Sequence, residues 1–367
     1  MAECFISPRM ACYTGNARVK LMPTMNRKHH RSLILFPLSL GVIGVFAGRE
    51  MASWRPVEVA RFAVKGAVAQ PSASDHAVAQ RIAVQPAFNN TFCALFDTRT
   101  GKVQNFNFKG SQPLGIQNGF FWHQQDGMRS DVPFLLKVLG ENKEEKSFTY
   151  RFPSFVEVSN QSLRILPEQN RVILLDWKGI YTWNFADQRF QGGVEIGGGV
   201  EGGSEMVRGS PSALSRDGRT FVFVDTQMAN RVIFQTGDTS TGKITKKTLQ
   251  SGSLISEYVA LSPYGRCALI NQPTNKNSCQ VVETAIGKSL WSFILLPLNS
   301  WTISDDEKTI FIHQGQSWQV RDLQTGALSR VLPSAPDAPL SPLPALSPDG
   351  RALYSVANGV LYRQRAR

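Results

Sequence analysis

Short apolar runs separated by polar turns organise the chain from about residue 160 onward, and residues 301–327 are the clearest example. A strand end at 302–304 is followed there by a polar turn at 305–308 and a β-rich run at 309–313. A second turn at 314–316 precedes the alternating apolar and polar positions of 318–321. Runs of β-branched, aromatic and aliphatic residues bounded by turn formers predict strands. The pattern therefore predicts an all-β chain built from repeated hairpins.

The same unit recurs along the chain, which is most visible at its turns. The turn before the second strand is found at 166–171 (LPEQNR), 214–219 (LSRDGR), 261–266 (LSPYGR), 303–308 (ISDDEK) and 346–351 (LSPDGR). The basic residues that close these turns are 48, 47, 42 and 43 residues apart. A second turn recurs at 97–102 (DTRTGK), 238–243 (DTSTGK), 283–288 (ETAIGK) and 322–326 (DLQTG). A repeat near forty-five residues with room for four strands indicates a β-propeller.

The units resemble WD-repeat or WD-like β-propeller blades, in the wider superfamily of bacterial WD-like and YVTN-type propellers. Residues 346–351 match the family's turn after the first strand. Val320, Arg321 and Asp322, followed by Thr-Gly at 325–326, stand where the family has its Val-Trp-Asp and Thr-Gly signature. Arg321 replaces the tryptophan, and no unit has the family's Gly-His pair. The resemblance implies four-stranded blades arranged as a propeller.

Blade number and closure follow from the two ends of the repeat. Residues 56–159 leave room for two further blades, which with the five aligned units makes seven, although six or eight stay open because these two units are not read from a clean repeat. The last unit stops after its third strand. An N-terminal segment commonly supplies the missing strand in WD-like propellers, which removes an open sheet edge. We expect residues 56–64 to be that strand.

The first 48 residues differ from the repeat. Basic residues at 27–31 (RKHHR) precede the uncharged apolar stretch 32–48. This order is typical of a signal peptide. The stretch is short for a spanning helix, which needs about 20 apolar residues, and Pro37, Gly41 and Gly44 weaken it further. A cleaved signal, a membrane tether through residues 33–47 and a buried apolar segment all stay open. We predict an N-terminal extension with signal or anchor at 1–48, a propeller at 49–367, and a periplasmic, secreted or membrane-anchored location; an intracellular scaffold is the remaining option.

Charge and cysteine content exclude some functions. The net charge is +12, of which the first 47 residues contribute +5. The basic clusters at 243–247 and 363–367 predict solvated turns and a tail, with a nucleic-acid or membrane-surface patch as the alternative. They lack the interleaved aromatic residues of a nucleic-acid site, so no nucleic-acid partner is expected. Cys93, Cys267 and Cys279 lie within the predicted propeller. We expect them to be small buried residues without a disulfide framework, with Cys267 nearest Val282 in its hairpin.

Motifs for chemistry are weak. Residues 197–202 fit a G-x-G-x-x-G string, but the strand and helix of a dinucleotide site do not flank it. His76, His123 and His313 are far apart in the sequence, and His313 is expected to be a packed strand residue. There is no G-x-S-x-G elbow. The sequence therefore predicts neither catalytic nor metal-ligating residues, and no cofactor.

The variable connections are the predicted binding surface. Both recurring turn types lie on one rim of a propeller, and the variable loops fall on the opposite rim. Function usually sits on variable loops carried by a rigid scaffold. The candidate binding residues are Asp225, Gln227, Asn230, Asn271, Asn275 and Gln314. We expect a monomeric, non-enzymatic scaffold for a protein partner. The alternative is a propeller enzyme or a cofactor or metal binder, lactonase-like or quinoprotein-like, with a site in the central channel.

Overall fold

The computed structural model describes most of the chain from Trp54 onward. The described segments are 54–61, 67–71, 81–86, 92–107, 112–117, 120–124, 134–139, 145–150, 162–176, 179–187, 189–196, 211–228, 231–251, 259–272, 278–294, 301–335, 344–347, 349–357 and 359–366. Contacts divide the chain into Met1–Gly48 and Arg49–Arg367, and every described residue belongs to the second unit. The predicted signal or anchor at 1–48 and the glycine-rich string at 197–202 lie outside the described residues.

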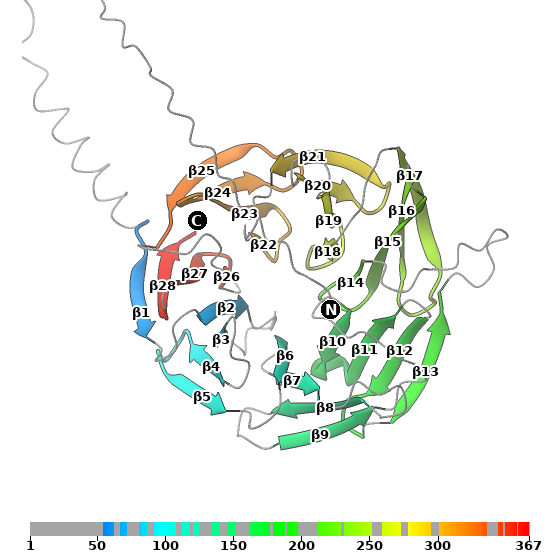
Figure 1. Ribbon diagram of the computed structural model, residues 1–367, viewed down its shortest axis with the longest axis horizontal. Coiled ribbons are helices and arrows are strands. Elements are labelled where there is room, and N and C mark those ends of the chain that lie inside the picture. Colours follow the sequence, from blue (N-terminus) through cyan, green and yellow to red (C-terminus); the bar gives the residue numbers. More distant parts are fainter. Residues whose placement is uncertain are drawn as a thin grey trace, which may run out of the picture. The chain divides into compact units, whose positions relative to one another are not determined.

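Within the second unit, the described residues form seven antiparallel sheets of four strands each (Figure 1). Two sheets precede residue 160: β2 (Ala67–Pro71), β3 (Arg81–Pro86), β4 (Phe92–Asp97) and β5 (Val103–Asn107), then β6 (Gln112–Gln117), β7 (Phe120–Gln124), β8 (Phe134–Leu139) and β9 (Glu145–Tyr150). Three follow: β10 (Leu163–Leu166), β11 (Arg171–Asp176), β12 (Gly179–Asn184) and β13 (Phe190–Glu195); β14 (Ser212–Leu214), β15 (Thr220–Met228), β16 (Arg231–Asp238) and β17 (Ile244–Ser251); and β18 (Val259–Leu261), β19 (Cys267–Gln272), β20 (Ser278–Glu283) and β21 (Lys288–Ile294). The prediction of four-stranded propeller blades is confirmed.

The last two sheets show how the propeller closes. One contains β22 (Trp301–Ile303), β23 (Thr309–Gln314), β24 (Ser317–Asp322) and β25 (Leu328–Pro333). The other contains β26 (Ala345–Leu346), β27 (Ala352–Ala357), β28 (Val360–Arg365) and, as its fourth strand, β1 (Val57–Arg61). β1 runs antiparallel to β28, with Val57 opposite Arg363 and Arg61 opposite Val360. The predicted N-terminal closing strand is therefore present within residues 56–64, and it covers an edge that β28 would otherwise expose.

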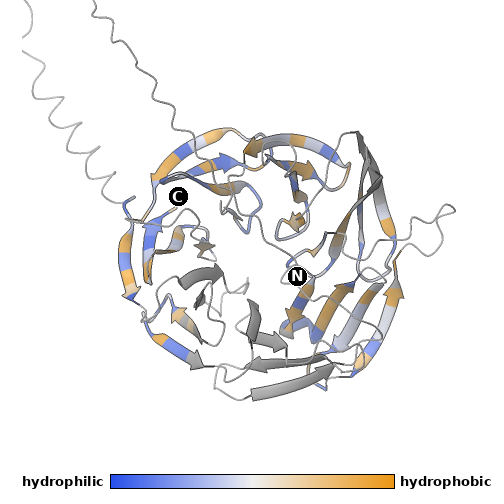
Figure 2. Ribbon diagram, viewed as in Figure 1, coloured by the Kyte–Doolittle hydropathy of each residue, from blue (hydrophilic) through white to orange (hydrophobic). Residues whose placement is uncertain are grey.

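Each sheet runs from an inner strand to an outer strand (Figure 1). In β11, five consecutive residues, Val172 to Asp176, are buried. Alternate residues of such a strand point to opposite faces, so an almost continuous apolar run is what a blade between two neighbours requires. Figure 2 shows hydrophobic bands on these inner strands and on the outer strands as well. The strongly apolar runs thus serve packing between blades.

The junction between the β18–β21 and β22–β25 blades illustrates this core. Cys267, Leu269 and Val281 on one blade pack with Ile310 and Ile312 on the other. Cys267 lies opposite Glu283, next to the Val282 expected from the sequence, and the second thiol of this blade lies opposite Asn271. The two cysteines are free and buried, as predicted. Among the described residues, helical structure is limited to the 3-10 turn at Pro167–Gln169, and no helix there is long and apolar enough to cross a membrane.

Candidate functional site

The residues predicted to bind a partner lie near the connections between second and third strands, which together with the inter-blade connections form the variable rim. Asp225 and Gln227 lie in β15, Asn271 lies in β19, and Gln314 ends β23. Asn230 and Asn275 lie outside the described residues. The structure thus places four of the six predicted positions on three consecutive blades, toward the same ends of their second strands.

These four positions lie in strands, whereas the sequence predicted loops at 225–230, 271–277 and 314–316, which include all of them. Met228 still pairs with Arg231, after a register shift beyond Asp225, so the β15–β16 connection is only residues 229–230. Asn271 pairs with Cys279 within the β19–β20 ladder. Polar residues mark a turn in a sequence, but backbone pairing can continue past them because the ladder uses main-chain groups alone. The loops of the variable rim are therefore shorter than predicted.

Gln314 joins two blades. Its side-chain amide donates to the backbone carbonyl of Ile294 at 3.2 Å, on the outer strand of the preceding blade. Its amide oxygen accepts from Gln319 Nε2 at 2.6 Å, and Gln319 in turn accepts from Arg321 Nε at 2.8 Å. Arg321 then donates to the carbonyl of Gly326 at 2.7 Å. Gln314 is thus the first member of a chain of hydrogen bonds that runs along β24, from the β23–β24 turn to the β24–β25 turn.

Asn271 lies on the face of β19 that meets the same neighbouring blade. Residues two apart in a strand share a face, so Asn271 is on the same face as Cys267 and Leu269. Both of these pack against Ile310 and Ile312 of β23. The Asn271 Oδ1 is buried and has no hydrogen-bond partner among the described residues. A buried amide oxygen without a partner costs stability unless a further group satisfies it. The Asn271 side-chain oxygen is therefore a hydrogen-bond acceptor that the described residues leave unused, at the junction between the β18–β21 and β22–β25 blades, which Gln314 also bridges.

His313, the neighbour of Gln314, is a packed residue, as predicted. Its side chain is 0% exposed. Its Nε2 lies 2.7 Å from Ser334 Oγ, and its ring packs against that of Trp318 in a tilted arrangement, with 4.7 Å between the ring centroids and 54° between the planes. Ser334 begins the connection to the next blade, so the imidazole ties that connection to the hairpin. Among the described residues, no group of three or more His, Cys, Asp or Glu side chains could hold a metal ion.

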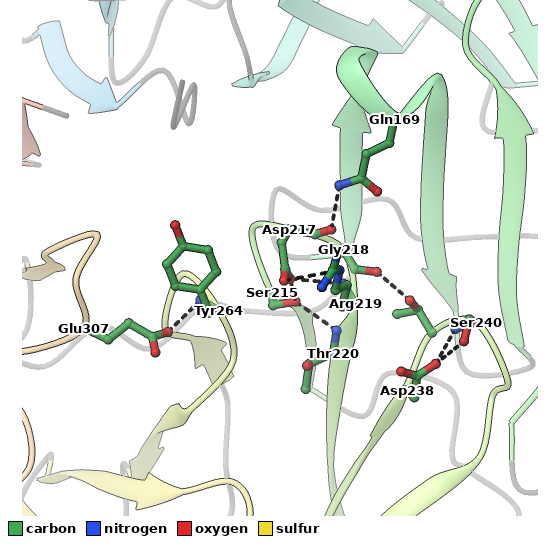
Figure 3. A network of polar contacts seen from close by, with 11 residues as sticks. Gln169, Ser215, Asp217, Gly218, Arg219, Thr220, Asp238, Ser240, Tyr264 and Glu307 are labelled. Atoms are coloured by element: carbon green, nitrogen blue, oxygen red, sulfur yellow. Dashed lines mark hydrogen bonds and ion pairs between the residues drawn. The ribbon is translucent and has the colours of Figure 1, made fainter. Parts of the chain in front are cut away.

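The opposite rim, called the turn rim below, carries the repeated Ser, Asp and Gly turns (Figure 3). In the β14–β15 turn, Ser215 Oγ donates to Asp217 Oδ1 at 2.6 Å and accepts from the Thr220 N–H at 2.9 Å. Gly218 closes this turn with a φ of 69°, a left-handed conformation that glycine adopts without strain. The same bonds recur around Ser304 and around Ser347. The repeated turn residues thus fix the hairpin geometry.

Glu307 departs from this pattern and was not singled out from the sequence. It occupies the position of the turn glycine, with a φ of 52°, and it is only 4% exposed. Its Oε1 accepts the backbone N–H of Tyr264 at 2.6 Å (Figure 3). Its Oε2 lies 3.4 Å from Arg266 Nε. Both partners belong to the turn of the preceding blade. A carboxylate has therefore replaced glycine and links two turns.

Other turn-rim contacts continue the linkage. Arg164 of β10 donates to the carbonyls of Leu214 and Ser215 at 2.5 and 3.0 Å. Arg216 pairs with Asp305 at 2.5 Å, although these residues belong to blades separated by the β18–β21 blade. The innermost turns of consecutive blades are thus tied to one another. The signal in the sequence was faint, because Arg216 and Asp305 stand at variable positions of a repeated turn.

Two outer-turn carboxylates have lowered pKa values. The hydroxyl of Ser240 lowers the pKa of Asp238, and the backbone N–H of Thr325 lowers the pKa of Asp322. Both carboxylates cap their own turns, since Asp322 Oδ1 also accepts the N–H of Gln324 at 3.0 Å. Hydrogen bonds to the ionised form explain such shifts without a reactive role. The hydrogen bonds of the turns therefore account for the lowered pKa values of Asp238 and Asp322.

No protein-family model matches the chain, and no curated protein matches it. Solved structures do. A chain of a mitotic checkpoint complex aligns with a TM-score of 0.53 at 13% identity, covering 85% of this chain and 93% of the other. A chain of hydrazine synthase from Kuenenia stuttgartiensis aligns with a TM-score of 0.52 at 16% identity, covering 83% of this chain and 97% of the other. At such low identity the similarity concerns the fold alone. With its four-stranded antiparallel blades and repeated turns, the chain has a β-propeller fold.

Proposed function

We propose that the protein is an exported or membrane-tethered, non-enzymatic propeller that holds a protein partner on its variable rim. The observation that carries the proposal is positional. Asp225, Gln227, Asn271 and Gln314 lie on three consecutive blades toward one rim, opposite the Ser, Asp and Gly turns. Binding residues are commonly found on variable segments of a rigid scaffold, and this rim is the variable side of the repeat.

The turn rim supports the proposal because its polar groups are used within the fold. Arg216 and Asp305 pair with each other, and Glu307 accepts from the preceding turn. Polar groups that bond to one another are less available to an external ligand. These contacts favour a structural role for the turn rim. On the variable rim Gln314 is also bonded within the fold, so the recognition proposal depends mainly on Asp225 and Gln227.

The structural neighbours do not decide between an assembly and an enzyme. One is named as part of a mitotic checkpoint complex and the other as a hydrazine synthase. Propellers host many functions, so function has to be argued from the site. The scaffold proposal is preferred over a central-channel enzyme because the charged side chains of Arg216, Asp305 and Glu307 at the inner turns form contacts between blades.

Export or tethering is proposed from the N-terminal sequence. Basic residues at 27–31 followed by the apolar stretch 32–48 are typical of a secretory signal or an uncleaved anchor. Intact-mass measurement and N-terminal sequencing of the protein from its native host test this point. A first residue near Gly48 supports cleavage after export, and a retained apolar stretch in a membrane fraction supports an anchor. A full-length protein in the soluble cytoplasmic fraction contradicts both.

The binding proposal is tested by substitution on the two rims. Asp225→Ala and Gln227→Ala should weaken capture of the native partner while changing the free energy of unfolding by no more than about 0.5 kcal/mol. Arg99→Ala and Lys288→Ala are matched controls, because both residues are exposed on the turn rim. Loss of capture in the controls alone would reject the proposed rim.

A further inference from the structure

The N-terminal entry to the propeller is held by an unusual aromatic contact. Trp54 lies three residues before β1. Its ring faces two guanidinium groups, with Arg330 Cζ at 4.6 Å from the ring centroid and Arg365 Cζ at 4.9 Å. Arg330 belongs to β25 and Arg365 to β28, so Trp54 lies at the junction of two blades. Its partly buried ring also packs on the core that contains Trp318. Trp54 therefore fixes the place where the chain enters the fold.

Exposed arginines and exposed apolar side chains surround this entry point. The Trp54 patch is defined by Trp54, Val57, Leu328, Arg330, Arg363 and Arg365. Val57 is 61% exposed and lies directly opposite Arg363, and Leu328 is 50% exposed, two residues before Arg330. Figure 2 shows that β1 and β25 both carry hydrophobic bands. The patch thus combines three cations with apolar side chains at the outer edge of the fold.

The carboxylates on the same strands and in the adjoining turn are engaged locally. Glu58 pairs with Arg61 at 2.9 Å, farther along β1. Asp322 Oδ1 accepts bonds from Thr325 and Gln324 within its own turn. The guanidinium groups of Arg330 and Arg365 lie over the Trp54 ring, and all three arginines of the patch are exposed residues. Such a surface is complementary to an anionic partner that also offers an apolar layer.

The length of the preceding chain indicates which anionic partner fits. Six residue steps separate Gly48 from Trp54, a span of at most about 22 Å even when fully extended. The apolar stretch 32–48 immediately precedes that span. If the stretch lies in a membrane, the Trp54 patch is held within about 22 Å of it, which raises its effective concentration at the headgroups.

We propose that the Trp54 patch docks on the headgroup surface of a membrane that contains anionic lipids. The proposal rests on the membrane tether proposed above, and it adds which face of the propeller meets the membrane. Arginine binds phosphate oxygens through its planar fork, and aromatic residues favour the membrane–water interface. Val57 and Leu328 would contact the outer part of the acyl layer. With this entry region on the membrane, the variable rim stays available to a protein partner.

The test uses the full-length chain with vesicles of neutral phosphatidylcholine, or with about 30% phosphatidylglycerol added, at low salt and at about 0.5 M salt, where surface charges are screened. A fluorescent amino acid, acridonylalanine, is placed at Leu328 and, in a control protein, at Val103, which also begins an outer strand and is 39% exposed. Quenching by a headgroup spin-labelled lipid reports contact with the membrane surface. We expect stronger quenching at position 328 than at 103, only with the anionic lipid and only at low salt.

Substitutions make the test specific. Arg330→Gln with Arg365→Gln should weaken the anionic-lipid contact about thirty-fold, as expected for the loss of two surface cations. Arg99→Gln with Arg189→Gln removes two exposed arginines from other blades and should change it little. Melting curves check that each variant folds.

The outcomes separate the patch from the tether. Binding to the vesicles is measured by flotation in a density gradient. Flotation with neutral vesicles that persists at about 0.5 M salt supports the tether. The patch is then supported if quenching is stronger at position 328 than at 103, and rejected if it is equal. Flotation with anionic vesicles alone, reversed by salt and by the Arg330 and Arg365 substitutions, supports the patch and rejects the tether. Equal quenching at 328 and 103, or no dependence on anionic lipid, overturns the proposal.

Discussion

Glu307 allows the strain of a turn to be weighed against the contact that it makes. The equivalent positions in sibling turns are Gly218, Gly265 and Gly350, with φ values of 69°, 76° and 65°. A residue with a Cβ pays about 1–2 kcal/mol in this left-handed region. In return, Glu307 accepts the Tyr264 N–H at 2.6 Å, and a hydrogen bond to a charged group contributes about 1.5–3 kcal/mol. The contact should therefore slightly outweigh the strain.

Two substitutions separate these terms. Glu307→Gly loses the contact but relieves the strain, and it gains flexibility in the unfolded chain, so we expect a loss of about 1–2 kcal/mol. Glu307→Ala loses the contact and keeps the strain, which should cost about 2–3 kcal/mol. The ion pair with Arg266 adds little, because that arginine is 73% exposed in its side chain. The expected order of stability is wild type, then glycine, then alanine.

Equilibrium urea unfolding, followed by tryptophan fluorescence and by circular dichroism, measures these free energies if the two transitions coincide. Tyr264→Phe is the control, because the contact uses the backbone N–H of Tyr264 and should survive. A glycine variant as stable as the wild type, or more stable, would refute the reasoning, since strain would then outweigh the carboxylate contact.

Three further predictions concern packing, acid stability and thiol reactivity. Gly326→Ala should lower the melting temperature well below that of Gly315→Ala, because an added Cβ at 326 meets an indole ring at 2.6 Å and one at 315 meets nothing within 4 Å; equal losses would contradict this packing. Asp322 has a lowered pKa in the folded state, so its contribution is present above the unfolded pKa of about 3.9 and is lost as pH falls through the folded value; Asp322→Asn should flatten the acid limb of stability against pH, and an unchanged slope would argue against the turn contact. Burial raises the pKa of Cys267 and of Cys279 to about 12, so neither thiol should react with iodoacetamide at neutral pH until the protein unfolds, as mapped by peptide mass; rapid labelling of the native protein would contradict their burial.

Most of the fold could be predicted from the sequence because its turns are chemically specific. The Ser, Asp and Gly residues that recur in 214–219 and 346–351 form the same hydrogen bonds in both turns. The last repeat unit has only three strands in the sequence, which predicted that an N-terminal strand would complete its sheet. β1 is that strand, paired with β28. Local residue chemistry was sufficient for these features.

The candidate site was less predictable because it depends on contacts between blades. Gln314 looked like a free loop residue, yet it donates to Ile294 of the preceding blade. Glu307 was visible as a departure from glycine, but its partner Tyr264 is 43 residues away. Asp225 lies in a ladder whose length no local signal marks. Contacts of this kind require the packed arrangement of neighbouring blades.

Photo-crosslinking from the two rims in the native host tests the central claim most directly. A photoreactive benzoylphenylalanine is placed at Gln227 or Asn230 on the variable rim and, separately, at Arg99 on the turn rim. The account predicts a discrete protein adduct from positions 227 and 230, with none from 99. An adduct from 99 alone, or the same adducts from both rims, would contradict binding through the variable rim.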